Sequence, residues 1–173
     1  MPKPAVVPFV APKQDAPKAR ILHISDIHID FEYQPGSIAN CGQPLCCRNS
    51  STIKKKHAKV AKNFKSNKAG YWGDYRNCDT PLWTIENMFD HISKNEEVIL
   101  IFLLKNVNKN HFFEFKFDFI YMTGDIPPHN VWNQTKSEQL HAIDVLTDLF
   151  LKYFPNKVIY STLGNHEAAP CNL

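Results

Sequence analysis

The sequence predicts an α/β fold in which short parallel strands alternate with helices. Three short runs rich in β-branched and aromatic residues have the length and composition of buried strands: residues 20–25, 119–123 and 158–163. Helical patterns separate these runs, and a strand–helix–strand order favours right-handed crossovers and parallel strands. A chain of 173 residues with 43% hydrophobic content suits one domain with a packed core.

The segment before the first strand, residues 1–19, is rich in proline and carries scattered lysines. We expect an extended linker here, since the segment has no long apolar stretch of the kind found in a secretory signal. Residues 20–173 form the expected domain. Within it, a lysine-rich loop is predicted at residues 54–68; it is either a solvated loop or a contact for anionic lipid headgroups.

Two amphipathic helices are predicted between the strands. The first spans residues 81–94, with Thr80 as N-cap and Pro81 at the first helical position. The second spans residues 136–154 and ends before Pro155. Residues 96–114 fit neither pattern, because a seven-residue apolar run is followed by an Asn- and Lys-rich patch. This stretch is either an additional strand and hairpin or an insertion foreign to the domain.

Four of the five cysteines lie close together in the sequence: Cys41, Cys46, Cys47 and Cys78. A zinc knuckle would need paired C-x2-C spacing, which this region lacks, so disulfides are the better interpretation. The pairing we expect is a small Cys41–Cys46 loop and a larger Cys47–Cys78 loop. Cys171 is left over and is either free or paired outside this chain.

The cysteines and two glycosylation sequons, at Asn49 and Asn133, together favour an oxidising secretory compartment. No apolar run is long enough to span a bilayer. Because no signal peptide is visible, we expect the N-terminus of the natural protein to be missing here.

Each predicted strand is followed by residues with metal-ligand chemistry: Asp26-Ile27-His28, Gly124-Asp125 and Gly164-Asn165-His166-Glu167. The carboxyl ends of parallel strands meet at one edge of a sheet, where ligands bind. We therefore expect one shared site. His23 alternates inside the first strand, and we expect it in the core.

Mixed Asp, His and Asn ligands suit zinc, manganese or iron. Asp125 could bridge two metals, since one carboxylate has two oxygens, and Asn165 offers a neutral carbonyl oxygen. Two such metals would polarise a phosphoryl group. His166 is a candidate to protonate the leaving oxygen. His129 is either a contact at this site or a plain surface residue.

The motifs together resemble calcineurin-like metallophosphoesterases, and within them the acid sphingomyelinases. The resemblance rests on the three strand-end motifs, the cysteine pattern, residues 69–75 (AGYWGDY), Cys78-Asp79, and the segment from Gly124 through His129 to Trp132. It implies a β-sheet sandwich flanked by helices, with residues 20–173 as the N-terminal part of the catalytic domain. The expected disulfides also agree with the pattern of this family.

The resemblance further implies a monomeric, zinc-dependent, secreted or lysosomal glycoprotein. Such an enzyme hydrolyses sphingomyelin to ceramide and phosphocholine at a lipid membrane surface and has no nucleic-acid partner. Two zinc ions would be held by Asp26, His28, Asp125 and Asn165. His166 would be the proton donor, and His129 would assist at the phosphate.

Further histidines that the family carries downstream do not follow His166 here. We therefore expect an incomplete portion of the enzyme, truncated at its C-terminal side. The resemblance also leaves open a relative that acts on nucleotide phosphodiesters, or a non-catalytic fragment produced by a gene-model artefact.

Overall fold

The computed structural model describes residues 19–52, 67–103 and 117–168, with short pieces of chain before residue 19. Five elements follow one another in the alternating order expected for an α/β fold: β1 (Ile21–Ile24), α1 (Leu82–Leu103), β2 (Phe119–Met122), α2 (Lys136–Tyr153) and β3 (Val158–Ser161). Strand and helix alternation is thereby confirmed.

The three strands form one parallel sheet with β2 in the centre. Leu22 pairs with Ile120 and Ile120 with Ile159, so the strands start and end at nearly the same level. All three carboxyl ends consequently lie at the same edge of the sheet. The polar motifs that follow the strands are brought together there.

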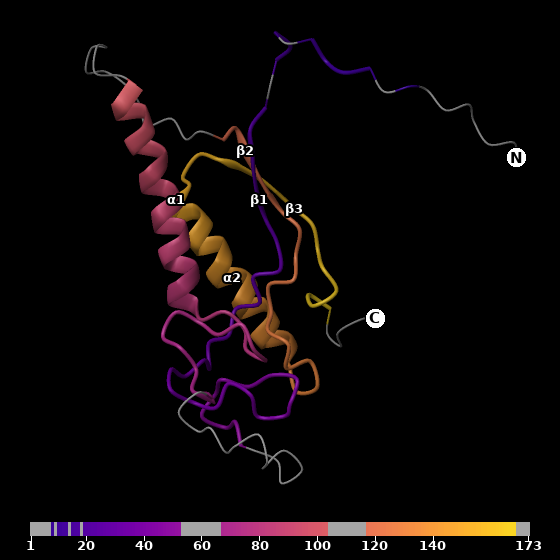
Figure 1. The fold of residues 1–173 in the computed structure, drawn as a ribbon. Coiled ribbons are helices and arrows are strands. Elements are labelled where there is room, and N and C mark those ends of the chain that lie inside the picture. The colour runs from indigo at the N-terminus through magenta and orange to yellow at the C-terminus, as the bar shows by residue number, and fades with distance from the viewer. Residues whose placement is uncertain are drawn as a thin grey trace, which may run out of the picture.

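One face of the sheet is covered by both helices (Figure 1). Ile120 and Met122 of β2 are completely buried under Phe89 of α1 and Leu146 of α2, which belong to the same apolar cluster. The Phe89 and Phe150 rings lie 5.0 Å apart and join the two helices. Burial of this helical face provides the main driving force for assembling the sheet.

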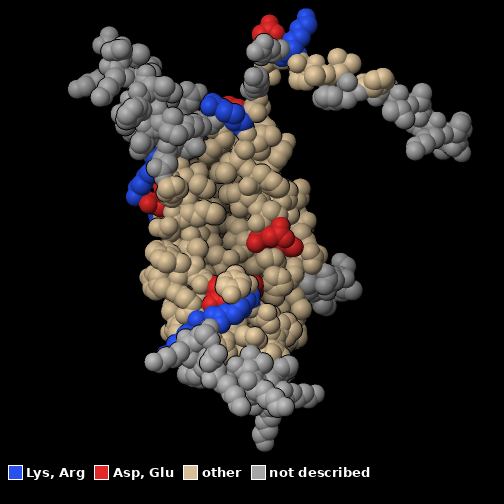
Figure 2. Space-filling view, in the orientation of Figure 1, with Lys and Arg blue, Asp and Glu red and all other residues tan. Residues whose placement is uncertain are grey.

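The opposite face of the sheet is not covered by the residues that the structure describes. Tyr121 and Tyr160 are 41% and 56% exposed, and their rings lie 5.8 Å apart on this face. Few charged side chains interrupt the side of the molecule seen in Figure 2. The sandwich expected from the sequence needs a second sheet, and the described segments contain only one.

His23 is exposed and not buried in the core, so the prediction for this residue is wrong. It points to the open face of the sheet, where its Nε2 is 3.0 Å from Thr123 Oγ1. Side chains of β1 do alternate between the two faces of the sheet as predicted, but His23 lies on the face that the helices do not cover.

The helix α1 is longer than the sequence pattern predicts. It continues through Leu103, so the apolar run at residues 98–103 is helical and not the start of an added strand. Residues 104–114, the rest of the unexplained segment, lie outside the described residues. By contrast α2 matches its predicted bounds, and a capping box between Thr135 and Glu138 sets its start.

The two expected disulfides are present, as Cys41–Cys46 and Cys47–Cys78. They tie the loops between β1 and α1 into a compact lobe. A buried ion pair reinforces the lobe, since Arg48 contacts the Asp30 carboxylate at 2.9 Å. Most of the lysine-rich loop, at residues 53–66, and Cys171 lie outside the described residues. None of the described helices is long and apolar enough to cross a lipid bilayer.

Candidate metal centre

Backbone hydrogen bonds hold the loops after β1 and β2 side by side. The Asp26 and His28 N–H groups donate to the carbonyls of Gly124 and Asp125, at 3.2 and 3.1 Å. Each loop therefore continues the pairing of the sheet beyond the strands themselves. The side chains of Asp26, His28 and Asp125 are fixed by backbone that has little freedom to move.

The backbone of these three residues is unusual. Asp26, His28 and Asp125 have φ values of 52°, 43° and 60°, in the left-handed region. Such conformations cost about 1–3 kcal/mol for residues other than glycine and occur mainly at functional sites. Here they turn consecutive polar side chains toward the edge of the sheet.

Two glycines let the loops after β2 and β3 approach closely. Gly124 has φ +86°, and a Cβ added to it would lie 2.7 Å from Gly164 Cα. A Cβ added to Gly164 would lie 2.6 Å from the backbone nitrogen of Asp125. These contacts are closer than real Cβ atoms allow, so both positions require glycine.

Asp26, His28 and Asp125 together form a candidate metal site. One ligand atom from each lies within 4.8 Å of the other two. His28 Nδ1 lies 2.9 Å from the Pro127 carbonyl oxygen and must donate to it, because a carbonyl can only accept. The Nε2 of His28 is therefore left with its lone pair available for a metal.

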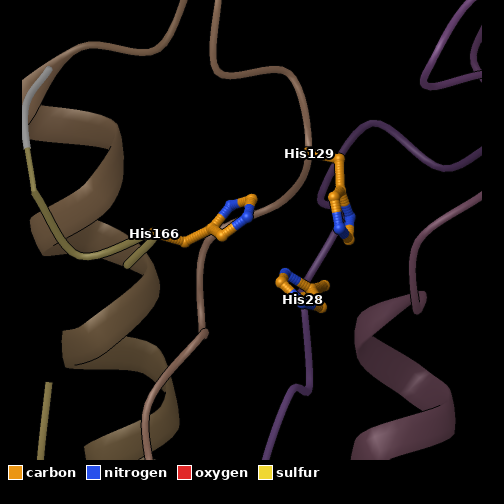
Figure 3. Close-up of side chains that lie close together, drawn as sticks. All are labelled: His28, His129 and His166. Atoms are coloured by element: carbon orange, nitrogen blue, oxygen red, sulfur yellow. The ribbon is translucent and has the colours of Figure 1, made fainter. Parts of the chain in front are cut away.

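His28, His129 and His166 converge on a common space from the loops after β1, β2 and β3 (Figure 3). The His28 ring is 4.0 Å from that of His129 and 4.8 Å from that of His166. His129 therefore lies at the site and not on a remote part of the surface. The Nδ1 of His166 is buried and has no hydrogen-bond partner among the described residues.

Asn165 follows β3 and is exposed at the same edge of the sheet. The N–H of its neighbour His166 donates to Asp125 Oδ1 at 3.1 Å. This bond places the Gly164–His166 turn against the Asp125 carboxylate. All six of the predicted metal and catalytic residues thus lie in the loops at one edge.

Three residues that hold the site together were missed in the sequence analysis. Glu167 accepts hydrogen bonds from the backbone N–H groups of Asp125 and Ile126, at 3.1 and 2.7 Å, and also from Gly164. Gln139, buried on α2, donates to the carbonyls of His166 and Ala168. Asp79 bonds His129. The sequence signal was present for Glu167, which belongs to the Gly-Asn-His-Glu motif, but its partners depend on the fold.

The histidines at the site differ in their preference for charge. Burial lowers the pKa of His28, and the neighbouring rings of His129 and His166 lower it further. The hydrogen bond to Asp79 raises the pKa of His129 above its usual value. The surroundings of His28 thus favour the neutral form, which metal binding requires, while those of His129 favour the cation.

Comparison with known families identifies the chain. The calcineurin-like phosphoesterase family matches residues 19–172. The chain belongs to this family. The parallel sheet and two helices agree with the calcineurin-like fold and represent part of such a domain.

Individual relatives of this chain are sphingomyelin phosphodiesterases by name. The chain is 37% identical over 172 residues, 99% of its length, to sphingomyelin phosphodiesterase B of Dictyostelium discoideum, and covers 23% of that protein. It is 35% identical over 154 residues to the human sphingomyelin phosphodiesterase and covers 20% of it. Sphingomyelin phosphodiesterase 1 of Caenorhabditis elegans is 38% identical over 152 residues, with 22% covered. The chain therefore spans about a fifth of the length of these relatives.

The donor set of the site fits a divalent metal ion. Two carboxylates and one imidazole meet at Asp26, His28 and Asp125. The His28 bond to Pro127 is the outer contact that metal-bound histidines usually make. These oxygen and nitrogen ligands suit zinc, manganese and iron alike.

Proposed function

We propose that this chain carries the first part of the active site of a zinc-dependent phosphodiesterase that hydrolyses sphingomyelin to ceramide and phosphocholine. The observation that carries the proposal is the meeting of Asp26, His28 and Asp125 beside His129 and His166. The similarity to sphingomyelin phosphodiesterases supports the choice of substrate. Because the chain spans about a fifth of those relatives, the activity of the whole protein is part of the proposal.

In this proposal Asp26, His28 and Asp125 hold one zinc ion, and Asp125 and Asn165 contribute to a second. When bound, the metal pair acts as a Lewis acid toward the phosphoryl group and activates water. The Asp125 carboxylate has two oxygens, so it can reach both ions. The hydrogen bond from His166 N–H to Asp125 Oδ1 keeps the neighbouring Asn165 close to the Asp125 carboxylate.

His166 is proposed as the acid that gives its proton to the leaving oxygen of ceramide. Its buried ring faces His28 edge-on, so it can reach a phosphate held beside the metal ligands. His129, whose surroundings favour the cation, contacts a phosphate oxygen. A charged hydrogen bond of this kind stabilises the additional negative charge in the transition state.

The decisive test is release of phosphocholine from sphingomyelin by the zinc-loaded full-length protein that contains this chain. We expect Asp125→Ala to lose more than about 100-fold in activity, beyond the 10- to 100-fold typical of residues behind the ligands. Asp148→Ala, on the exposed side of α2, is the matched control and should keep full activity. An Asp125→Ala protein with normal activity would rule out the assignment.

Substrate choice and metal binding are tested separately. A nucleotide phosphodiester assayed beside sphingomyelin distinguishes the second candidate, a relative that acts on nucleotides. Calorimetric titration of the chain with zinc distinguishes the third candidate, a non-catalytic fragment. Weak binding with no turnover would favour a fragment, and tight binding of two ions would count against it.

The proposal also covers the environment of the enzyme. The disulfides and the exposed sequon residues Asn49 and Asn133 support a secreted or lysosomal glycoprotein. The proposal further takes the protein to be a monomer that works at a lipid membrane surface. A mass shift on treatment with a glycosidase, absent after Asn49→Gln and Asn133→Gln, tests glycosylation. Thr135 is a poor choice for this test, because it also caps α2.

A further inference from the structure

Asp79 contacts His129 with both of its carboxylate oxygens. Oδ2 accepts the backbone N–H of His129 at 2.6 Å, and Oδ1 lies 2.7 Å from the ring Nδ1. The Asp79 side chain is only 7% exposed. A carboxylate in these surroundings accepts hydrogen bonds and does not donate them, so the ring must supply the proton.

The segment that bears Asp79 is anchored on both sides. Cys78 is bonded to Cys47 through a disulfide. On the other side, the Thr80 N–H donates to the His28 carbonyl at 3.0 Å, and the Thr80 carbonyl accepts from Asp30. The carboxylate is thus fixed relative to the same β1 loop that carries the metal ligands.

We propose that Asp79 is the positioning residue of His129: it holds the ring with the proton on Nδ1 and with Nε2 facing His28 and His166. The two interactions act together, because the bond to the backbone fixes the loop and the bond to Nδ1 fixes the ring. With Nδ1 held by Asp79, Nε2 is the second nitrogen of a ring that lies beside the space shared with His28 and His166 (Figure 3). The consequence for hydrolysis rests on the proposed function, while the ring orientation does not.

A purely structural link between two loops would be the simpler role for Asp79. The isosteric change Asp79→Asn separates the two roles, since asparagine offers one oxygen acceptor where aspartate offers two. The backbone N–H of His129 can only donate, so the asparagine oxygen must face it, and the amide NH₂ is left facing Nδ1. Nδ1 must then accept, and the proton moves to Nε2, as happens when the aspartate of a catalytic triad becomes asparagine.

The test is the long-range ¹H–¹⁵N spectrum of the imidazole rings of the 173-residue chain, recorded in alkaline buffer where the rings are neutral. His129→Gln identifies the signal of His129. We expect Nδ1–H in the wild type and Nε2–H in Asp79→Asn. An Nε2–H ring in the wild type, or an unchanged tautomer in a folded Asp79→Asn chain, would overturn the proposal. The wild-type spectrum decides even where the variant does not fold.

Asp74→Asn is the matched structural control. Asp74 lies in the same loop and forms an ion pair with Arg76, but within the described part of the chain it makes no hydrogen bond or ion pair with His129. This variant should lose stability and leave the His129 tautomer unchanged. A tautomer change in Asp74→Asn would mean that any loosening of the lobe is sufficient, which would contradict a specific role for Asp79.

The kinetic consequence is measured in the zinc-loaded enzyme. Asp79→Asn should lower kcat by about 10- to 100-fold with little change in KM, as residues that orient active-site groups do. An increase in KM alone would contradict positioning of a group that acts in the transition state. A wild-type protein without phosphodiesterase activity would contradict the proposed function and leave the tautomer result valid.

Discussion

His28 and His129 have rings in contact, yet their surroundings favour opposite protonation states. Burial keeps the pKa of His28 low, whereas the Asp79 carboxylate raises that of His129. One ring is consequently available as a neutral ligand, and its neighbour is prepared to carry charge. Adjacent groups with separated pKa values are typical of sites that combine metal binding with acid–base chemistry.

Gly124 provides a test at the scale of one residue. Gly124→Ala should destabilise the chain by more than about 3 kcal/mol and weaken zinc binding, because the new Cβ collides with the Gly164 backbone. Gly36→Ala is the control: it has a similar φ of +80° but open space around it, so only the conformational cost of about 1 kcal/mol applies. Urea unfolding and zinc calorimetry measure both variants, and equal losses would show that the close approach is unimportant.

Roles that depend on contacts between distant segments could not be predicted from the sequence. Asp79 and His129 are 50 residues apart, and nothing in either local pattern links them. Asp26, His28 and Asp125, in contrast, could be predicted because each follows a strand, and parallel strands deliver their ends to one edge. The meeting of these three side chains was therefore accessible to sequence analysis, whereas the contacts of Asp79 with His129 were not.

Among the elements, α2 and α1 show what periodicity can and cannot specify. The end of α2 could be placed from its regular apolar stripe and Pro155. The last two turns of α1 could not, because a wholly apolar run has no polar face to distinguish a helix from a strand. His23 was misplaced for a related reason: alternation separates the two faces of a strand but does not say which one is covered.

The start of α2 gives a prediction at this scale. Thr135 accepts from the Glu138 N–H, and the Glu138 side chain accepts from the Thr135 N–H at 2.7 Å. Thr135→Ala should lower the free energy of unfolding by about 1 kcal/mol, since one N–H at the helix start loses its partner. Thr147→Ala, in the exposed middle of α2, should change it by less than about 0.5 kcal/mol. Thermal unfolding compares the two, and equal effects would contradict a capping role.

In the molecule as a whole, the disulfide-bonded lobe and the helix-covered sheet meet at the metal-binding loops. The Ile29–Thr80 bridge connects the loop after β1 to the segment after Cys78. Arg48 and Asp30 form a buried pair beside it. Stability of the lobe and geometry of the site are therefore coupled.

The two disulfides should contribute unequally to the whole. The Cys47–Cys78 bond spans 31 residues, so its removal by paired serine substitution should cost about 4 kcal/mol in the chain-entropy model, against about 2 kcal/mol for Cys41–Cys46, which spans 5. Urea unfolding of the two double variants gives the comparison. Loss of the Cys47–Cys78 bond should also broaden the His129 imidazole signal. A larger decrease in the free energy of unfolding on loss of Cys41–Cys46 than on loss of Cys47–Cys78 would contradict the prediction.

The left-handed backbone at Asp26, His28 and Asp125 has a consequence on the scale of evolution. At each of these positions the backbone conformation costs about 1 kcal/mol of stability that glycine would recover. The aspartates and the histidine are therefore maintained only while selection preserves the chemistry. A duplicated gene whose product no longer needs metal should drift toward glycine or asparagine at all three. Such a substitution pattern would mark copies of this gene that no longer need metal, even where the surrounding motifs survive.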